Sequence, residues 1–245
     1  MCVAKCAGTL PVQETRKDEL RIICVLGRSG AGKDSKVEKA MKLVGDHYDV
    51  LVMSNLLVEA QKKDPEFKAY AEKLMAQGEL LPDGKVMEVL FEALGQYEGT
   101  DKIILLNGFP RTELQAVELM KRQTSNHYKV ETVLLVELDE EIIIERLADR
   151  RVCPNRCPSS PYTVSDYHPP KVPGICDDCG AELIQRADDK PETIRKRIRE
   201  YDANEGLIVS ALTGTGEVSL LKVDNADGKA CQARFNAILT EIAGL

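Results

Sequence analysis

Tryptophan is absent from this chain of 245 residues, and its other large aromatic residues are seven tyrosines and four phenylalanines. This scarcity argues against a surface that stacks nucleic-acid bases. A basic excess is also lacking, because the formal net charge is −7 and the isoelectric point is about 5.2, which argues against general nucleic-acid binding. An anionic ligand must therefore be met by a local concentration of arginine and lysine.

The first nineteen residues contain no continuous apolar segment, so they predict neither a secretory signal nor a membrane span. We expect residues 1–18 to form a flexible extension of a cytoplasmic, monomeric protein that has no membrane partner. In a protein that is not exported, the eight cysteines are expected to be reduced thiols or metal ligands.

Short apolar runs alternate with helix-like stretches along the chain. Strands are expected at 21–26, 48–54, 103–109, 132–138 and 219–223, and helices after residue 33 and near 56–76, 83–97, 112–123, 140–149, 191–210 and 229–243. Strands that alternate with helices favour parallel pairing through right-handed crossovers. The apolar runs show little alternation, as expected when both faces of a sheet are covered. The sequence therefore predicts an α/β fold with a five-stranded parallel sheet flanked by helices.

Residues 27–33 read Gly-Arg-Ser-Gly-Ala-Gly-Lys and lie between the first apolar run and a helix-like run. This is the context of a phosphate-binding loop, because glycines let backbone N–H groups surround phosphate oxygens and the helix N-terminus adds a positive dipole. Lys33 would reach the outer phosphates, and Ser35 offers a hydroxyl for phosphate or Mg²⁺. An ordinary glycine-rich turn would explain the glycines but not the lysine, so the loop predicts nucleotide binding.

Residues 151–190 interrupt the pattern, because they hold a cluster of prolines, four cysteines and no helical period. Eighteen residues separate the two cysteine pairs, which are Cys153 with Cys157 and Cys176 with Cys179. Such pairs suit a closed tetrahedral Zn²⁺ site, which would supply the folding free energy that a segment poor in apolar residues lacks. Four thiolates leave no open position for catalysis, so we expect a structural zinc. A nucleic-acid-binding zinc ribbon is the rival interpretation, and His168 is an alternative ligand.

In their order along the chain, the motifs resemble those of adenylate kinases, in the long form with a zinc-type lid. The resemblance extends from about residue 21 to the C-terminus. The matching segments are 27–33, 78–83 (Gly-Glu-Leu-Leu-Pro-Asp), 107–112 (Asn-Gly-Phe-Pro-Arg-Thr, where the family has Asp-Gly-Phe-Pro-Arg-Thr), 150–153, 169–171, 185–189 and 192–197. The resemblance implies reversible, Mg²⁺-dependent transfer of a phosphoryl group from ATP to AMP, which gives two ADP.

The resemblance also assigns regions and residues. It implies a core at 19–51, 82–148 and 190–245, a subdomain at 52–81 that binds the nucleoside monophosphate, and a lid at 149–189. The implied ATP-binding residues are Gly27, Ser29, Gly30, Ala31, Gly32, Lys33, Asp34, Ser35, Arg146 and Arg150. The implied AMP-binding residues are Met53, Val58, Leu81, Gly108, Arg111, Gln115, Arg186 and Arg197. The residues expected around the transferring group are Lys33, Arg111, Arg150, Arg186 and Arg197, since this chemistry needs positioning and charge neutralisation.

Several assignments have structural alternatives. Each arginine could occupy a solvated helix face, and Arg146 could instead pair with its acidic neighbours. Gln115, implied to hydrogen-bond the adenine of the monophosphate, could be a polar residue at a helix start. Asp188 and Asp189 could hold water or lid arginines, or could be acids favoured by a helix dipole.

Two departures from the family's pattern fall beside the expected phosphates. Asp34 follows the loop lysine where the family has glycine, and its charge would repel a phosphate unless it points outward or pairs with Lys36 or Lys39. Asn107 replaces the first aspartate of the family signature, so it loses charge attraction for the shell of a Mg²⁺ ion.

Two further departures fall on the acceptor side. Met53 lies where the family has a threonine that contacts adenine, and Val58 lies where it has an arginine that grips the monophosphate. Lys62 or Lys63 could replace that arginine from the next helical turn. The alternatives are therefore another nucleoside monophosphate kinase, or a nucleotide-binding protein of the same fold with weakened catalysis.

Overall fold

The central sheet of the computed structural model has five parallel strands in the order β2-β3-β1-β4-β7. The strands are β1 (Leu20–Leu26), β2 (Tyr48–Val52), β3 (Ile103–Asn107), β4 (Tyr128–Glu137) and β7 (Ser219–Asp224). The structure describes residues 19–77, 79–123, 125–155, 157, 159–163 and 168–245; the expected extension at 1–18 and Gly78 lie outside these ranges. The predicted fold class is confirmed.

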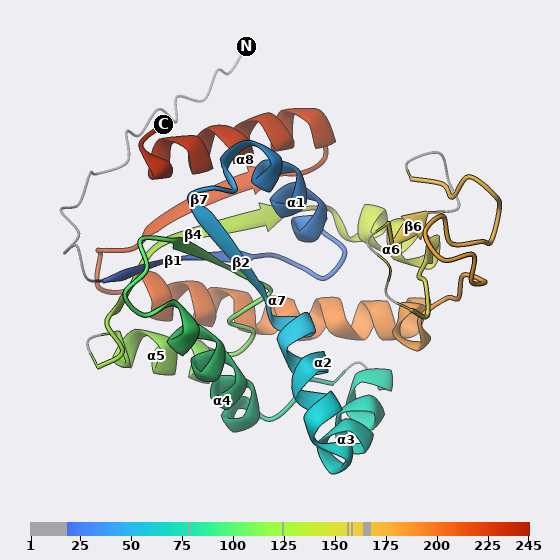
Figure 1. Cartoon of the computed structure of the whole chain (residues 1–245), viewed down its shortest axis with the longest axis horizontal. Helices are drawn as coiled ribbons and strands as arrows, with labels where there is room; N and C mark the ends of the chain where they lie inside the picture. The colour runs from blue at the N-terminus through green and yellow to red at the C-terminus, as the bar shows by residue number, and fades with distance from the viewer. Residues whose placement is uncertain (1–18, 78, 124, 156, 158, 164–167) are drawn as a thin grey trace.

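Helices cover both faces of the sheet (Figure 1). One face packs against α1 (Lys33–Val44), α6 (Glu140–Ala148) and α8 (Gly228–Ala243). The other face packs against α4 (Asp83–Leu94), which continues into the short helix η1 (Gly95–Tyr97), and α5 (Glu113–Lys121). The long helix α7 (Pro191–Thr213) contributes buried residues to both layers.

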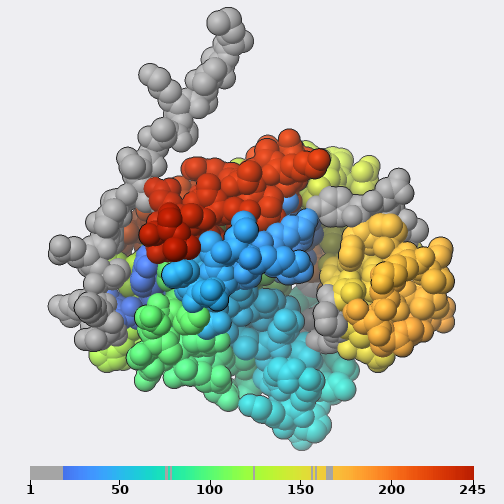
Figure 2. Space-filling view, turned by 45° about the horizontal axis from the view of Figure 1, so that its top comes forward, coloured from blue at the N-terminus to red at the C-terminus, as the bar shows by residue number. Residues whose placement is uncertain are grey.

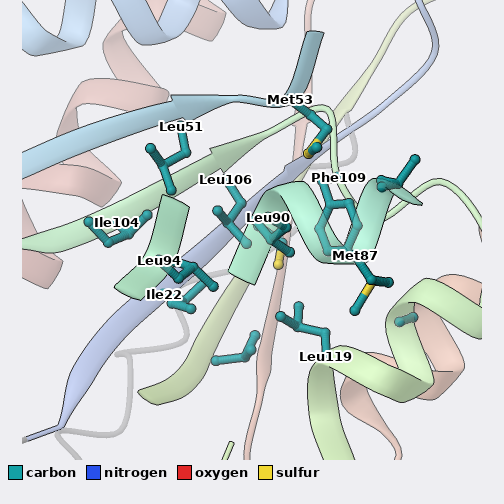
Figure 3. Close-up of a cluster of buried hydrophobic side chains, with 14 of the residues drawn as sticks. Ile22, Leu51, Met53, Met87, Leu90, Leu94, Ile104, Leu106, Phe109 and Leu119 are labelled. Atoms are coloured by element: carbon teal, nitrogen blue, oxygen red, sulfur yellow. The ribbon is translucent and has the colours of Figure 1, made fainter. Parts of the chain in front are cut away.

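The layer beneath α4 shows how one apolar face of the sheet is buried (Figure 3). Ile22, Ile104 and Leu106 project from β1 and β3 and pack against Leu90 and Leu94 of α4. Each of these five side chains is no more than 4% exposed. Burial of an aliphatic side chain stabilises the fold by roughly 1.5–3 kcal/mol.

Several expected boundaries differ from those in the structure; β2, for example, ends at Val52 and not at 54, and β4 begins at Tyr128 and not at 132. Two other differences have a clear local cause. The strand expected to reach residue 109 ends at Asn107, because Gly108 adopts a φ of 76° that extended backbone does not. The helix expected over 56–76 is two helices, α2 (Met53–Lys63) and α3 (Pro65–Ala76). Pro65 disfavours a helical conformation for the residue before it, and the carboxylate of Asp64 accepts a hydrogen bond from the Phe67 N–H at 2.9 Å.

The segment that follows α6 forms a separate lobe beside the core, coloured yellow to orange in Figure 2. It contains the antiparallel pair β5 (Arg150–Arg151) and β6 (Tyr162–Thr163), and returns to the core through η2 (Ala187–Asp189). The described part of the lobe has no α-helix, as its composition predicted. Among all the described residues, no helix has the length and apolar character needed to cross a bilayer.

Candidate active site

The loop after β1 lies at the point where the order of the sheet reverses. β1 pairs with β3 on one side and with β4 on the other. The connection after β1 leads to β2 on the β3 side, whereas β4 and β7 lie on the opposite side, so a crevice opens at the carboxyl end of β1. In open α/β sheets, ligands bind at this position. The loop ends at Gly32, and α1 begins at Lys33. Backbone N–H groups at the start of α1 therefore face this crevice.

Two glycines of the loop have no room for a side chain. Gly27 has a φ of 137°, and a Cβ atom there would lie 2.2 Å from the carbonyl oxygen of Val136 in β4. Gly32 has a φ of 90°, and a Cβ atom there would lie 2.6 Å from Nδ2 of Asn225. The loop therefore needs glycine to pack against β4 and against the residue that follows β7.

Lys33 folds back over the loop that precedes it. Its ammonium group donates hydrogen bonds to the carbonyl oxygens of Gly27, at 2.7 Å, and Arg28, at 2.8 Å. Burial lowers the pKa of Lys33 to about 8; the charge of Asp34 opposes this shift, and Arg111 and Arg197 add to it. The loop region is therefore crowded with positive charge that a polyanion would neutralise.

A cavity of about 720 Å³ opens over this loop, between the core, the lobe and the α2–α3 region. The predicted site residues that line it are Gly27, Ser29, Gly30, Gly32, Lys33, Asp34, Ser35, Gly108, Arg111, Arg146, Arg150, Arg186 and Arg197. Ala31 does not contribute to the lining, because its side chain is fully buried. The structure thus brings together residues from four separate parts of the sequence.

Carboxylates at the end of the lobe hold two of the arginines. Arg150 forms two hydrogen bonds with Asp189, Nε to Oδ2 at 2.8 Å and Nη2 to Oδ1 at 2.5 Å. Arg197 donates to Asp188 at 2.6 Å. Both acids therefore pair with arginine, which is one of the alternatives that the sequence left open. Burial lowers the pKa of Arg186, which lies close to Arg150 and Arg197.

A smaller cavity of about 70 Å³ adjoins the first beside α2. Its lining includes Met53, Leu81, Gly108, Arg111 and Gln115 of the predicted residues. Val58 lines neither cavity.

The suggested replacement of the missing arginine by Lys62 or Lys63 is wrong. Both side chains point to the surface, 65% and 74% exposed, where Lys62 pairs with Glu59 and Lys63 with Glu92. Because these carboxylates lie on the solvated face, neither ammonium group reaches the cavity lining.

The side-chain amide of Gln115 is engaged within the protein. Its Oε1 accepts from the Arg111 N–H at 2.8 Å, and its Nε2 donates to Asp83 at 2.7 Å. Thr112 caps the same helix by accepting from the Gln115 N–H at 3.1 Å. The amide therefore positions the segment that carries Arg111, which is a structural role beside the predicted contact with adenine.

Asp34 and Asn107, the two departures beside the expected phosphates, lie against each other. Nδ2 of Asn107 donates to Oδ1 of Asp34 at 2.6 Å. Asp34 is solvent-exposed, but it lines the main cavity and therefore does not point away from the expected phosphate site. Lys36, one of the two possible partners of Asp34, does not pair with it, because its ammonium group donates instead to the carbonyl oxygen of Gly228 at 2.6 Å.

Asn225 is a cavity residue that the sequence did not reveal. It is 2% exposed, and its Nδ2 donates to the carbonyl oxygen of Ala31 at 2.7 Å, which ties the phosphate loop to the end of β7. Tyr201 of α7 also lines the cavity, and burial raises its pKa. A single asparagine or tyrosine outside any motif gives no sequence signal for such a role.

The four cysteines of the lobe converge. The sulfur atoms of Cys153, Cys157, Cys176 and Cys179 all lie within 4.8 Å of one another. Cys153 Sγ is 3.7 Å from Cys157 Sγ and 3.5 Å from Cys179 Sγ. Sulfur ligands of a tetrahedral Zn²⁺ ion with bonds of about 2.3 Å are about 3.8 Å apart, so the group fits that ion. His168 is not part of this group; its ring stacks on Tyr162 with centroids 5.4 Å apart.

A glycine-rich loop at the switch point of a parallel sheet, faced by a lysine and several arginines, defines the class of P-loop phosphotransferases. A family model described as adenylate kinase matches residues 25–216. An adenylate kinase of Caldicellulosiruptor saccharolyticus is 37% identical over 203 residues, which cover 79% of this chain and 91% of the relative. The chain belongs to the adenylate kinase family.

Other relatives agree with this assignment. An adenylate kinase of Carboxydothermus hydrogenoformans is 36% identical over 217 residues, covering 88% of this chain and 96% of the relative. One of Thermococcus kodakarensis is 34% identical over 194 residues, covering 79% and 83%. The predicted enzyme class, a nucleoside monophosphate kinase, is confirmed.

Proposed function

We propose that the main cavity binds Mg·ATP on the loop at 27–33 and that AMP binds where the smaller cavity adjoins it, so that a phosphoryl group passes from ATP to AMP to give two ADP. The observation that carries this proposal is the convergence of Lys33, Arg111, Arg186 and Arg197 on one cavity over the loop. These cations fit the negative charge of two nucleotides whose phosphates meet.

The chain's own contribution is positioning. Lys33 and the N-terminus of α1 hold the donor phosphates, and arginines from α7 and both ends of the lid surround the transferring group. An oxygen of the acceptor phosphate forms the new P–O bond while the bond to the leaving ADP breaks. The acceptor oxygen is already anionic at neutral pH, so no general base is required. Mg²⁺ bound to ATP would neutralise developing charge on the phosphate oxygens.

The lid at 149–189 and the acceptor subdomain at 52–81 are proposed to close over the nucleotides. Lys196 of α7 supports this assignment, because its ammonium group donates to the Gln77 carbonyl oxygen at 3.0 Å and to Glu79 at 3.2 Å. These contacts join the segment that follows α3 to α7 of the core. Closure would exclude water that otherwise takes the phosphoryl group.

A coupled assay for ADP formation from ATP and AMP tests the activity. Lys33→Met should abolish turnover, whereas Lys62→Met, at an exposed lysine paired with Glu59, should retain it. If the wild-type chain binds Mg·ATP but produces no ADP with any monophosphate, the weakened nucleotide-binding protein replaces the enzyme.

A different acceptor is the second candidate. The observation that favours it is the position of Val58, which lines neither cavity and leaves α2 without a cation toward the acceptor phosphate. Loss of a charge-assisted hydrogen bond costs roughly 1.5–3 kcal/mol, or about ten- to a hundredfold in affinity. Profiling with AMP, CMP, UMP and GMP tests this candidate; AMP should have the highest kcat/KM under the first proposal.

We also propose that the four cysteines hold one structural Zn²⁺ ion. The sulfur spacing supports this, and the lobe has little other core, since its buried cluster consists of Cys153, Tyr162, Cys176 and Leu183. Metal analysis should find one zinc ion per chain, and Cys157→Ser should release it. Light scattering tests the expected monomer, and titration with DNA tests the expected lack of affinity for nucleic acid.

A further inference from the structure

The contact between Asp34 and Asn107 joins residues that are 73 positions apart in the sequence. Asp34 is the second residue of α1, and Asn107 is the last residue of β3. Parallel pairing places Asn107 beside Val25, two residues before the phosphate loop begins. The loop then brings the first turn of α1 to the end of β3, so the two side chains meet in the lining of the cavity.

The pair places one carboxylate among the cations of the cavity. Asp34 is exposed to the cavity, whereas Asn107 is 2% exposed. The amide donates through Nδ2 to the carboxylate, and its Oδ1 is buried without a hydrogen-bond donor among the described residues. The charge of Asp34 acts on both Lys33 and Arg111, where it raises the pKa that burial lowers. One negative charge therefore lines the expected phosphate site, beside an amide oxygen that is buried without a donor among the described residues.

These features fit a hydrated Mg²⁺ ion. Mg²⁺ is a hard cation that keeps several of its water ligands, and those waters can donate hydrogen bonds to a carboxylate such as that of Asp34. An aspartate at position 34 with no compensating change would place a second carboxylate beside the one that the family signature has at position 107. In this chain position 107 is an amide, so the number of carboxylates across the contact stays at one.

We propose that Asp34 and Asn107 are a single compensated exchange, in which the carboxylate of the family signature has moved from the end of β3 to the first turn of α1. Asp34 is then the positioning residue for the waters of Mg·ATP, and Asn107 orients its carboxylate. The inference rests on the proposed binding of Mg·ATP in this cavity. It reverses the expectation that these departures weaken the site.

The exchange predicts that its two halves depend on each other. Asn107→Asp alone would place two carboxylates in a contact that is now 2.6 Å, and like charges at this distance repel strongly. Asp34→Gly alone would leave the site with no carboxylate at either position. The double variant would again have one carboxylate, now on β3, and should therefore recover what both single variants lose.

Calorimetric titration with ATP, with and without Mg²⁺, measures this dependence. The readout is the factor by which Mg²⁺ tightens ATP binding, compared among wild type, Asp34→Gly, Asn107→Asp and the double variant. Asp34→Gly should reduce this factor by about tenfold, as for the loss of one charge-assisted hydrogen bond. The double variant should return to within about twofold of wild type. Without nucleotide, Asn107→Asp should melt more than about 2 °C below both wild type and the double variant.

Asp34→Asn is the matched control for shape, because it keeps the size of the side chain and removes only its charge. It should lose the Mg²⁺ effect as Asp34→Gly does. The exchange is overturned if Asp34→Asn keeps the wild-type factor, or if the losses of the single variants add in the double variant. Failure of the proposed function has a different signature, since the wild-type chain would then bind no ATP with or without Mg²⁺.

Discussion

The carboxylate of Asp189 pairs with Arg150 and so joins the two ends of the lobe, and its removal gives a quantitative test of the structure. The side chain is fully buried, and its partner Arg150 is 15% exposed. Breaking a buried ion pair by removing one partner typically costs about 3–5 kcal/mol, because the other charge stays buried without compensation. Asp189→Asn keeps one acceptor oxygen, and Arg150 can gain solvent from the cavity. We therefore expect the lower end, about 3 kcal/mol.

Chemical denaturation followed by circular dichroism measures this loss. Asp189 lies two residues before Pro191, where α7 begins, and α7 packs in both layers of the core. The loss should therefore appear in the global transition. For a chain of this size, about 3 kcal/mol corresponds to a fall of about 6–12 °C in melting temperature.

Asp202→Asn is the matched control. Asp202 also accepts two hydrogen bonds from one arginine, Arg28, both at 2.7 Å, but the side chains are 37% and 29% exposed. Solvent screening should reduce the cost of this substitution to below about 1 kcal/mol. Equal losses in the two variants, or a loss below about 1 kcal/mol for Asp189→Asn, would refute the argument from burial.

Three other outcomes are expected. Because the pKa of Lys33 is lowered to about 8, the unfolded chain binds more protons than the native chain above that pH, and the free energy of unfolding should rise between about pH 8 and 10. ATP binding should take up protons in the same range, which calorimetry in buffers of different ionisation enthalpy would detect. Gly27→Ala should abolish ATP binding, since its Cβ would lie 2.2 Å from the Val136 oxygen, and wild-type affinity would contradict the loop geometry. Gln115→Ala should lower the free energy of unfolding by about 1–3 kcal/mol, since it leaves the Arg111 N–H without its acceptor; an effect on AMP affinity alone would favour a purely ligand-binding role.

Much of the fold was predictable because it depends on local chemistry. The apolar runs at β1, β3 and β4 indicate strands buried on both faces, and the loop at 27–33 carries its own backbone requirement for glycine. The break between α2 and α3 was also present in the sequence, as an aspartate followed by proline at residue 65, although helical periodicity continues on both sides of it.

The arrangement of the site depended on tertiary structure. No spacing rule connects Asp34 with Asn107, or Asn225 with the loop, because each pair meets only when strands align in register. The opposite held for Lys62 and Lys63: sequence proximity suggested a role in the site, but the turn of α2 directs both to solvent.

The sequence by itself determined the class of fold, the phosphate loop, the paired cysteines and the order of motifs, since these follow from backbone freedom, periodic burial and ligand spacing within short segments. Only the tertiary structure decided which charges face each other across the cavity. Coulomb energy varies with distance in space and with exposure to solvent, and neither can be read from separation along the chain.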